Sequence, residues 1–216
     1  VAGTLLCGPA EREGLGGPLL VSPGIPANHP ERVGRCRGLE GAREGRRPIW
    51  VRVFARGGGS ARFRCTAGRS HGRAPLAWAR RTLSPAAMVD VATLTAACVV
   101  ALGPTTAGLF GPDGVVVDAV EAAARAAGEE VWRLPMVESL REQVKGERAD
   151  MKNAGDRAGG SISAAHFLHA FAKDTPWAHL DIAGPSHATK ERGYVGKGGT
   201  GFALRTLVEL VRAWKA

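Results

Sequence analysis

The amino-acid sequence predicts an α/β fold for residues 88–216, a sheet layered between helices, preceded by a largely irregular segment over residues 1–87. Short apolar runs recur after Met88, as is typical of strands. Longer stretches between these runs carry apolar residues three and four positions apart, as is typical of helices. Because strands alternate with helices, and because 216 residues can bury one good core, we expect one main domain.

Three apolar runs after Met88 are expected to form strands. They span residues 88–94 (MVDVATL), 131–134 (VWRL) and 177–182 (WAHLDI). The first is nearly continuous in apolar residues, which indicates a buried strand. Leu109 and Phe110 are expected just before a turn at the sequence GPDG.

Helices are expected between and after these strands, over residues 96–102, 115–127, 137–144, 161–172 and 201–214. The stretch over residues 115–127 places Val117, Val120 and Ala124 on one inner stripe. Asp113 is expected to cap the start of this helix, and Ser161 the start of the helix over residues 161–172.

Residues 1–87 differ in composition from the rest of the chain. They hold 15 of the 30 Gly, with fifteen Arg and five Glu but no Lys or Asp, which gives a formal charge of +10 against −1 for residues 88–216. Only residues 48–55 (PIWVRVFA) alternate as a short strand does. Because such a composition buries little apolar surface, we expect this segment to be largely irregular and place a domain boundary at Met88.

Two interpretations of the Arg-rich segment stay open. One is that residues 1–87 come in part from a mistranslated frame, a retained intron or a wrong start site, since Arg, Gly, Pro and Ala are residues of GC-rich codons. The other is an arm that binds the phosphate backbone of a nucleic acid. Few aromatic residues are interleaved with the arginines, so the sequence argues against a nucleic-acid partner.

The composition also bears on the compartment. No apolar run is long enough to span a membrane, and no basic region precedes an apolar stretch at the start, so neither a membrane span nor a secretory signal is expected. The four cysteines, Cys7, Cys36, Cys65 and Cys98, form no CxxC pair and therefore no zinc knuckle. Free thiols indicate a reducing compartment, so we expect the cytoplasm.

Six segments after Met88 resemble the leucyl aminopeptidase family, in order and at the family's spacing. They are VDVATLTAACVVALG, AGLFGPD, VWRLP, ADMKNAGDRAGGSISAAHFL, WAHLDIAGP and GKGGTGFALRTLVELV. The resemblance covers residues 88–216. It implies the C-terminal part of a three-layer, mixed-sheet catalytic domain with helices on both faces, which makes the domain in this chain incomplete.

The resemblance also implies an activity and an assembly. Members are cytosolic homohexamers that release N-terminal amino acids, leucine preferred, from peptide substrates. Two divalent metals, manganese or zinc, activate the attacking water in these enzymes.

The family's site residues carry over to matching positions of this sequence. The main-chain carbonyl of Leu94 is implied to face the reacting centre and to help orient a bound bicarbonate. Thr93 is implied to line the pocket for the first side chain of the substrate, and Ala96 stands where the family usually has Gly. The substrate-binding set implied by the resemblance is Thr93, Thr95, Ala96, Ala183 and Ser186.

The family's metal ligands cannot be placed on this chain. They lie upstream of the VDVATL strand, in an NTDAEGRL motif and in an earlier region with a Lys and two Asp. Here the residues directly before Met88 read SHGRAPLAWARRTLSPAA, without Asp or Glu, and residues 1–87 hold no Asp or Lys. We therefore assign no metal ligand and expect this chain to bind no metal pair. A non-catalytic assembly subunit, or pseudoenzyme, is the alternative function.

Four other residues imitate a metal site by their spacing. His166 and His169 lie three apart on an expected helix, and His179 and Asp181 lie two apart on an expected strand. The family does not use these residues for metal. We expect the two helix histidines at the surface or flank, and the two strand residues in local hydrogen bonds.

Overall fold

The computed structural model describes residues 20–22, 49–54, 76–112, 114–146, 150–153 and 155–214. Over residues 20–22 and 49–54 the description is of the backbone alone. No helix among these residues is long and apolar enough to cross a membrane.

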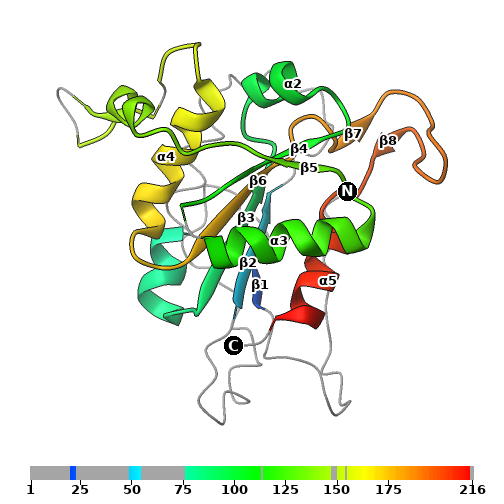
Figure 1. Cartoon of the computed structure of the whole chain (residues 1–216), viewed down its shortest axis with the longest axis horizontal. Coiled ribbons are helices and arrows are strands. Elements are labelled where there is room, and N and C mark those ends of the chain that lie inside the picture. The colour runs from blue at the N-terminus through cyan, green and yellow to red at the C-terminus, as the bar shows by residue number, and fades with distance from the viewer. Residues whose placement is uncertain are drawn as a thin grey trace, which may run out of the picture.

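The centre of the fold is a six-stranded sheet in the order β1-β2-β3-β6-β4-β5 (Figure 1). Strands β1, β2, β3 and β6 run parallel to one another, whereas β4 is antiparallel to β6 and parallel to β5. The sheet is therefore mixed, as the family resemblance implied. The strand bounds are β1 Leu20–Ser22, β2 Ile49–Phe54, β3 Ala87–Ala92, β4 Ala107–Phe110, β5 Val131–Arg133 and β6 Trp177–Asp181.

Helices cover both faces of this sheet. They are α2 Ala96–Leu102, α3 Gly114–Ala127, α4 Gly160–Ala172 and α5 Leu204–Ala213, with a further helix over residues 76–83. Two 3-10 turns, η2 Glu138–Leu140 and η3 Glu142–Val144, precede α4, and a small hairpin of β7 His187–Ala188 and β8 Gly198–Gly199 precedes α5.

Alternation along β3 and β6 divides the core into two apolar clusters. Val89 and Leu180 belong to the cluster under α3 and α5, whereas Met88 and Trp177 belong to the cluster under α4 and the helix over residues 76–83. Every residue of β3, β4 and β6 is buried, because each strand lies inside the sheet with helices on both sides. The three-layer architecture expected from the sequence is thus confirmed.

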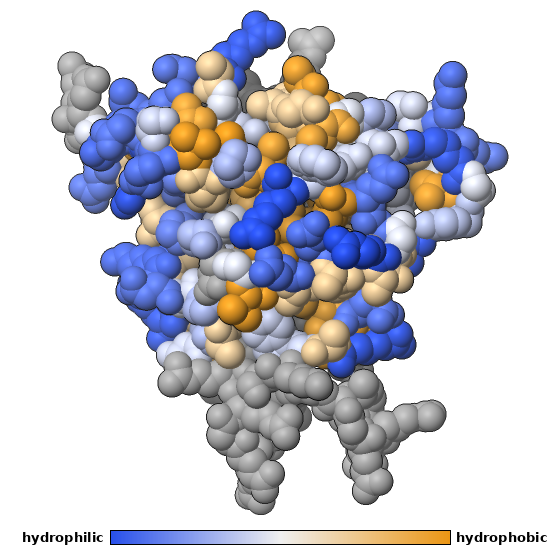
Figure 2. Space-filling model, in the orientation of Figure 1, coloured by the Kyte–Doolittle hydropathy of each residue, from blue (hydrophilic) through white to orange (hydrophobic). Residues whose placement is uncertain are grey.

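The surface of the molecule mixes polar and apolar side chains. On the face drawn in Figure 2, apolar residues form separate patches among hydrophilic ones. The large apolar side chains that are exposed belong to several elements, among them Val100 of α2, Val115 of α3, Trp132 of β5 and Val208 of α5.

Several predicted elements have different limits in the structure. The strand expected over residues 88–94 ends at Ala92, because the next backbone N–H groups bond to a side chain instead of a neighbouring strand. Residues 137–144 form two 3-10 turns in place of an α-helix, with bonds such as Leu140 N–H to Val137 carbonyl. Strand β4 was not predicted, because its four residues are all buried and show no alternation.

Two helices begin at other residues than the sequence predicted, and a third helix was not expected. Ser161 lies inside α4 instead of capping it, since α4 starts at Gly160 after Gly159, a residue with a positive φ of 66° that favours glycine. The last helix, α5, begins at Leu204, three residues later than expected. The helix over residues 76–83 was not expected in the Arg-rich segment, although Leu76 and Ala79 are buried on its inner side. The Asp113 cap lies outside the described residues.

Candidate functional site

The site residues implied by the sequence lie in two turns at one edge of the sheet. The first turn, residues 93–95, follows β3, and the second turn, residues 182–186, follows β6. Because β3 and β6 are parallel neighbours, with Ala92 opposite Asp181, both turns leave the sheet at the same end. The carboxyl ends of parallel strands are a common place for ligand sites in α/β proteins.

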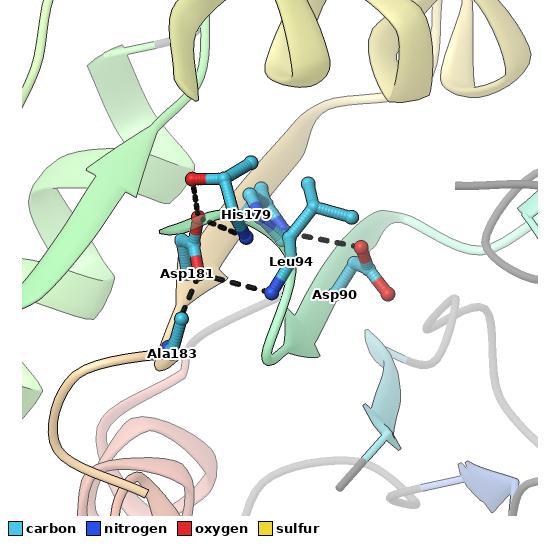
Figure 3. Close-up of polar contacts among 6 residues, drawn as sticks. Asp90, Leu94, His179, Asp181 and Ala183 are labelled. Carbon is cyan, nitrogen blue, oxygen red and sulfur yellow. Dashed lines mark hydrogen bonds and ion pairs between the residues drawn. The ribbon is translucent and has the colours of Figure 1, made fainter. Parts of the chain in front are cut away.

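The carboxylate of Asp181 joins the two turns, as Figure 3 shows. Its Oδ1 accepts hydrogen bonds from the Leu94 N–H at 3.0 Å and from the Ala183 N–H at 3.1 Å. Its Oδ2 accepts from the Thr95 N–H at 3.0 Å and from the Thr95 hydroxyl at 2.7 Å. We call these four residues the Asp181 clasp. A carboxylate that is 1 % exposed is thus fully hydrogen-bonded within the protein.

Thr95 connects the clasp to helix α2. Its backbone is extended, with a φ of −134°, and its hydroxyl accepts a hydrogen bond from the Cys98 N–H at 3.0 Å. The same hydroxyl donates to Asp181, so one side chain caps α2 and holds the turn to β6. Ala96, the first residue of α2, is exposed beside it.

The second turn is held by its own contacts. The Ser186 N–H donates to the Ile182 carbonyl at 3.0 Å, and the Thr200 hydroxyl donates to the Pro185 carbonyl at 2.6 Å. Gly184 approaches the end of α2 so closely that a Cβ on it would lie 2.3 Å from the Gly103 carbonyl oxygen. The start of α2 is therefore held to Asp181, the last residue of β6, and its end contacts Gly184 in the second turn.

Thr93 has a side-chain hydroxyl whose hydrogen bonds are not satisfied by the described residues. This hydroxyl is buried. Ala183 and Ser186 are half-buried, as are Thr93 and Leu94. The structure therefore brings the two groups of predicted residues to one edge of the sheet.

Burial sets the ionisation of the clasp. It raises the pKa of the Asp181 carboxyl above the ordinary value of 3.8, although His179 and the hydrogen bonds from Thr95, Ala183 and Leu94 act in the opposite direction. Cys98 lies beside this residue, with its Sγ 3.7 Å from the Asp181 carbonyl oxygen. Burial and then the charge of Asp181 raise the pKa of this thiol to about 12, so Cys98 is protonated at neutral pH and is no nucleophile.

The pKa of Asp181 leads to a pH dependence that can be measured. Because the pKa is raised by folding, this group's contribution to stability is fully present below the unfolded value of 3.8 and is lost as pH rises through the folded value. We expect the amide proton resonances of Leu94, Thr95 and Ala183 to move together, with a common midpoint above pH 3.8, in an NMR titration of the full chain. Three separate midpoints would contradict the clasp, and a common midpoint below 3.8 would contradict the dominance of burial over the hydrogen bonds.

A second buried polar pair lies beneath the clasp. The Nδ1 of His179 is 3.0 Å from the Asp90 Oδ2, across the β3–β6 pair, and both side chains are buried. The imidazole stacks between Phe110 and Trp177, at ring-centre distances of 6.0 and 6.1 Å. The Nε2 of His179 has no hydrogen-bond partner among the described residues. Since it is 0 % exposed, His179 cannot reach a substrate and serves the core.

The described residues do not fit a metal pair. Among them, no group of three or more His, Cys, Asp or Glu side chains could hold a metal ion. His166 is buried, with its Nε2 2.9 Å from the Val137 carbonyl oxygen, so the expectation of a surface or flank position was wrong for this residue. His169 is half-buried, and its ring lies 5.6 Å from that of Trp177. His179 and Asp181 form the local hydrogen bonds that the sequence predicted.

A shallow depression lies at the opposite end of β6. It has a volume of about 330 Å³ and includes His169, Lys173 and Pro176 in its lining. Because Pro176 precedes β6 and the two turns follow β3 and β6, this depression is separate from the candidate site.

Two buried carboxylates received no role from the sequence. Asp181 was considered only as a partner in local hydrogen bonds, and Glu129 was not considered. Glu129 is buried at the start of α5, where it accepts hydrogen bonds from the Ala203 N–H, the Thr206 N–H and the Thr206 hydroxyl. Arg205 lies 3.5 Å from the same carboxylate, so the two side chains form an ion pair. An acidic residue that ends an apolar run directly before a turn is the signal that could have identified Asp181.

Comparison with known proteins identifies the family. The catalytic domain of the cytosol aminopeptidase family matches residues 74–208, and this match begins upstream of Met88. A probable cytosol aminopeptidase of Synechococcus sp. (strain JA-3-3Ab) is 57 % identical over 127 residues, which are 59 % of this chain and 25 % of that protein. One of Rippkaea orientalis is 57 % identical over 125 residues, which are 58 % of this chain and 26 % of that protein. This chain thus spans about a quarter of the length of these relatives.

Solved structures agree with these matches. A tomato leucine aminopeptidase mutant superimposes with a TM-score of 0.62 at 41 % identity, over 66 % of this chain and 27 % of that one. The bottromycin maturation enzyme BotP in complex with Mn gives 0.64 at 43 % identity, over 68 % of this chain and 33 % of that one. With its fold and its sequence both matched, the chain belongs to the cytosol aminopeptidase family.

Proposed function

We propose that the two turns joined by Asp181 receive the first residue of a peptide in a metal-dependent aminopeptidase that prefers N-terminal leucine. Family membership supports the peptidase reaction, and the relatives' names support the release of N-terminal residues. The observation that carries the proposal is the Asp181 clasp, which brings Leu94 and Ala183 to one carboxylate oxygen. In the proposed site, Thr93, Thr95, Ala96, Ala183 and Ser186 contact the substrate.

The geometry of the clasp supports the role proposed for the Leu94 carbonyl. The described peptide bonds are trans, and in a trans peptide the N–H and C=O groups point in opposite directions. The Thr95 N–H belongs to the same peptide group as the Leu94 carbonyl, and it points at Asp181. The Leu94 carbonyl is therefore directed away from Asp181, an orientation that suits a contact with the substrate or with a bound bicarbonate.

We also propose that this chain alone is inactive. Residues 1–87 contain no Asp or Lys, and the described residues contain no cluster of ligands, so the residues present do not fit the two manganese or zinc ions of the family. Catalysis therefore needs ligands that these residues do not supply. A non-catalytic subunit that acts in assembly is the function proposed for the chain in that case.

The proposed location and assembly follow the family. We place the protein in the cytosol, as the names of its relatives suggest, and in a homo-oligomer, a hexamer by resemblance. Strand β5 lies at the edge of the sheet and is paired only with β4 among the described strands. The side chain of Trp132 in this strand is 64 % exposed. An unpaired edge with an exposed aromatic residue supports self-association. Nucleic-acid binding by the Arg-rich segment is the other alternative, and twelve of the fifteen Arg in residues 1–87 lie outside the described residues.

Binding of an amino-acid amide to the isotope-labelled full chain tests the proposed site. We expect L-leucine amide to shift the amide resonances of Thr93, Leu94, Thr95, Ala183 and Ser186, and glycine amide, which lacks a side chain, to shift them less. Shifts confined to the depression around His169 and Lys173, or no shifts at all, would count against the proposed site.

A further inference from the structure

We propose that Asp181 is a positioning residue that sets the direction of the Leu94 carbonyl and the separation of the two substrate-binding turns. The proposal rests on the proposed function, because it assumes that these turns contact a peptide. Asp181 itself does not touch the substrate in this account. It is 1 % exposed and acts through the backbone of residues on either side.

Asp181 fixes the direction of two carbonyl groups. The Leu94 N–H bonds to Oδ1 and the Thr95 N–H bonds to Oδ2, so two successive peptide groups have their N–H ends on one carboxylate. In trans peptides, the Thr93 and Leu94 carbonyls then both point away from Asp181. Rotation of either peptide would break a hydrogen bond to a charged, buried acceptor, which is a costly loss.

Asp181 also fixes the distance between the two turns. The Leu94 and Ala183 nitrogens lie 3.0 and 3.1 Å from the same oxygen atom, Oδ1. These two nitrogens belong to turns that follow different strands. One oxygen atom therefore fixes how closely the two turns approach each other. A change of this acceptor would alter the distance between the two turns. A displacement of about 1 Å in a binding site can lower activity by a large factor.

The chain contains a matched carboxylate that has no such role. Glu129 is also buried and also accepts one Thr hydroxyl, at the start of α5. It accepts two backbone N–H groups where Asp181 accepts three, and it lies 3.5 Å from Arg205. Its partners, Ala203 and Thr206, belong to neither turn. Glu129 therefore shows what a purely structural carboxylate of this kind contributes to stability.

The test compares Asp181→Asn with Glu129→Gln in the full chain. Each change replaces one accepting oxygen with an NH₂ group that faces N–H donors, so both variants should lose stability. In Asp181→Asn this conflict occurs at the Thr95 N–H, or at the Leu94 and Ala183 N–H groups. We expect the carbonyl carbon resonances of Thr93 and Leu94 to move in Asp181→Asn and to stay in place in Glu129→Gln.

Binding of L-leucine amide provides the functional readout. We expect Asp181→Asn to weaken its apparent affinity by about tenfold or more, and Glu129→Gln to leave it within about twofold. Equal weakening by both variants, or unmoved Thr93 and Leu94 carbonyl resonances in Asp181→Asn, would overturn the positioning role. If the unsubstituted chain binds no L-leucine amide, the proposed function fails, while the carbonyl resonances still decide the role of Asp181.

A milder variant covers the case in which Asp181→Asn does not fold. Thr95→Val removes the two hydrogen bonds of the Thr95 hydroxyl, one to Asp181 Oδ2 and one from the Cys98 N–H. The three backbone N–H bonds to Asp181 are left in place. We expect smaller movements of the same two carbonyl resonances in Thr95→Val and none in Thr95→Ser, which keeps the hydroxyl. If the Thr93 and Leu94 carbonyl resonances are the same in Thr95→Val as in Thr95→Ser, the proposal is overturned.

Discussion

Replacing Asp90 by alanine is expected to lower the free energy of unfolding by about 3 kcal/mol, one of the largest losses that a single side chain in this protein can cause. Asp90 is the hydrogen-bond partner of the His179 Nδ1, at 3.0 Å. Without it, an imidazole that is 0 % exposed and stacked between Phe110 and Trp177 has no described partner at either nitrogen. The measurement is urea unfolding of the full chain followed by circular dichroism.

Asp90→Asn is the matched control for this experiment. The asparagine amide oxygen can still accept a hydrogen bond from the His179 Nδ1–H, and its side chain has almost the same volume. We expect this variant to lose roughly 1 kcal/mol, which is the scale of a weakened neutral hydrogen bond. Equal losses for the alanine and asparagine variants would show that packing, and not the Asp90–His179 contact, stabilises this part of the core.

The second large effect is expected for Gly184→Ala, with a loss of about 2–3 kcal/mol. A Cβ at this position would lie 2.3 Å from the Gly103 carbonyl oxygen and 3.5 Å from the Pro104 Cα, and neither neighbour is a flexible side chain. The backbone of the second turn or the end of α2 must therefore move. Thermal unfolding of the full chain measures this loss, and a shift of the Ala183 and Ser186 amide resonances reports the movement.

Gly196→Ala provides the control for Gly184→Ala. Gly196 lies between β7 and β8, no heavy atom is within 4 Å of a Cβ built on it, and its φ is not positive. The same methyl group there should change the free energy of unfolding by less than about 0.5 kcal/mol. If Gly184→Ala is as stable as Gly196→Ala, the close contact with Gly103 does not constrain the second turn.

The sequence predicted the strands and helices whose patterns are local. Strand β6 and helix α3 lie close to their expected limits, because the apolar spacing over residues 115–127 and the run WAHLDI match the final structure. Strand β2 was predicted too, from the alternation in residues 48–55. The domain boundary at Met88 stays a prediction, and the family match begins earlier, at residue 74.

What the sequence did not predict depends on contacts between distant residues. The strand expected through Leu94 ends at Ala92, because Leu94 and Thr95 bond to Asp181, more than 80 residues later in the chain. Strand β4 is too short and too fully buried to show a period, and its direction is set by pairing with β6. For the site, the resemblance supplied the residues of both turns, but only the fold shows that one carboxylate joins them.

The most direct test of the account is an assay of the purified full chain with leucine 4-nitroanilide in the presence of manganese or zinc. The metal bound by the chain would be measured by equilibrium dialysis in the same buffers. We predict no stoichiometric metal binding and no release of leucine that a chelator abolishes, because the described residues supply no cluster of ligands and residues 1–87 contain no Asp or Lys. Metal-dependent release of leucine that stops on addition of a chelator would contradict the account.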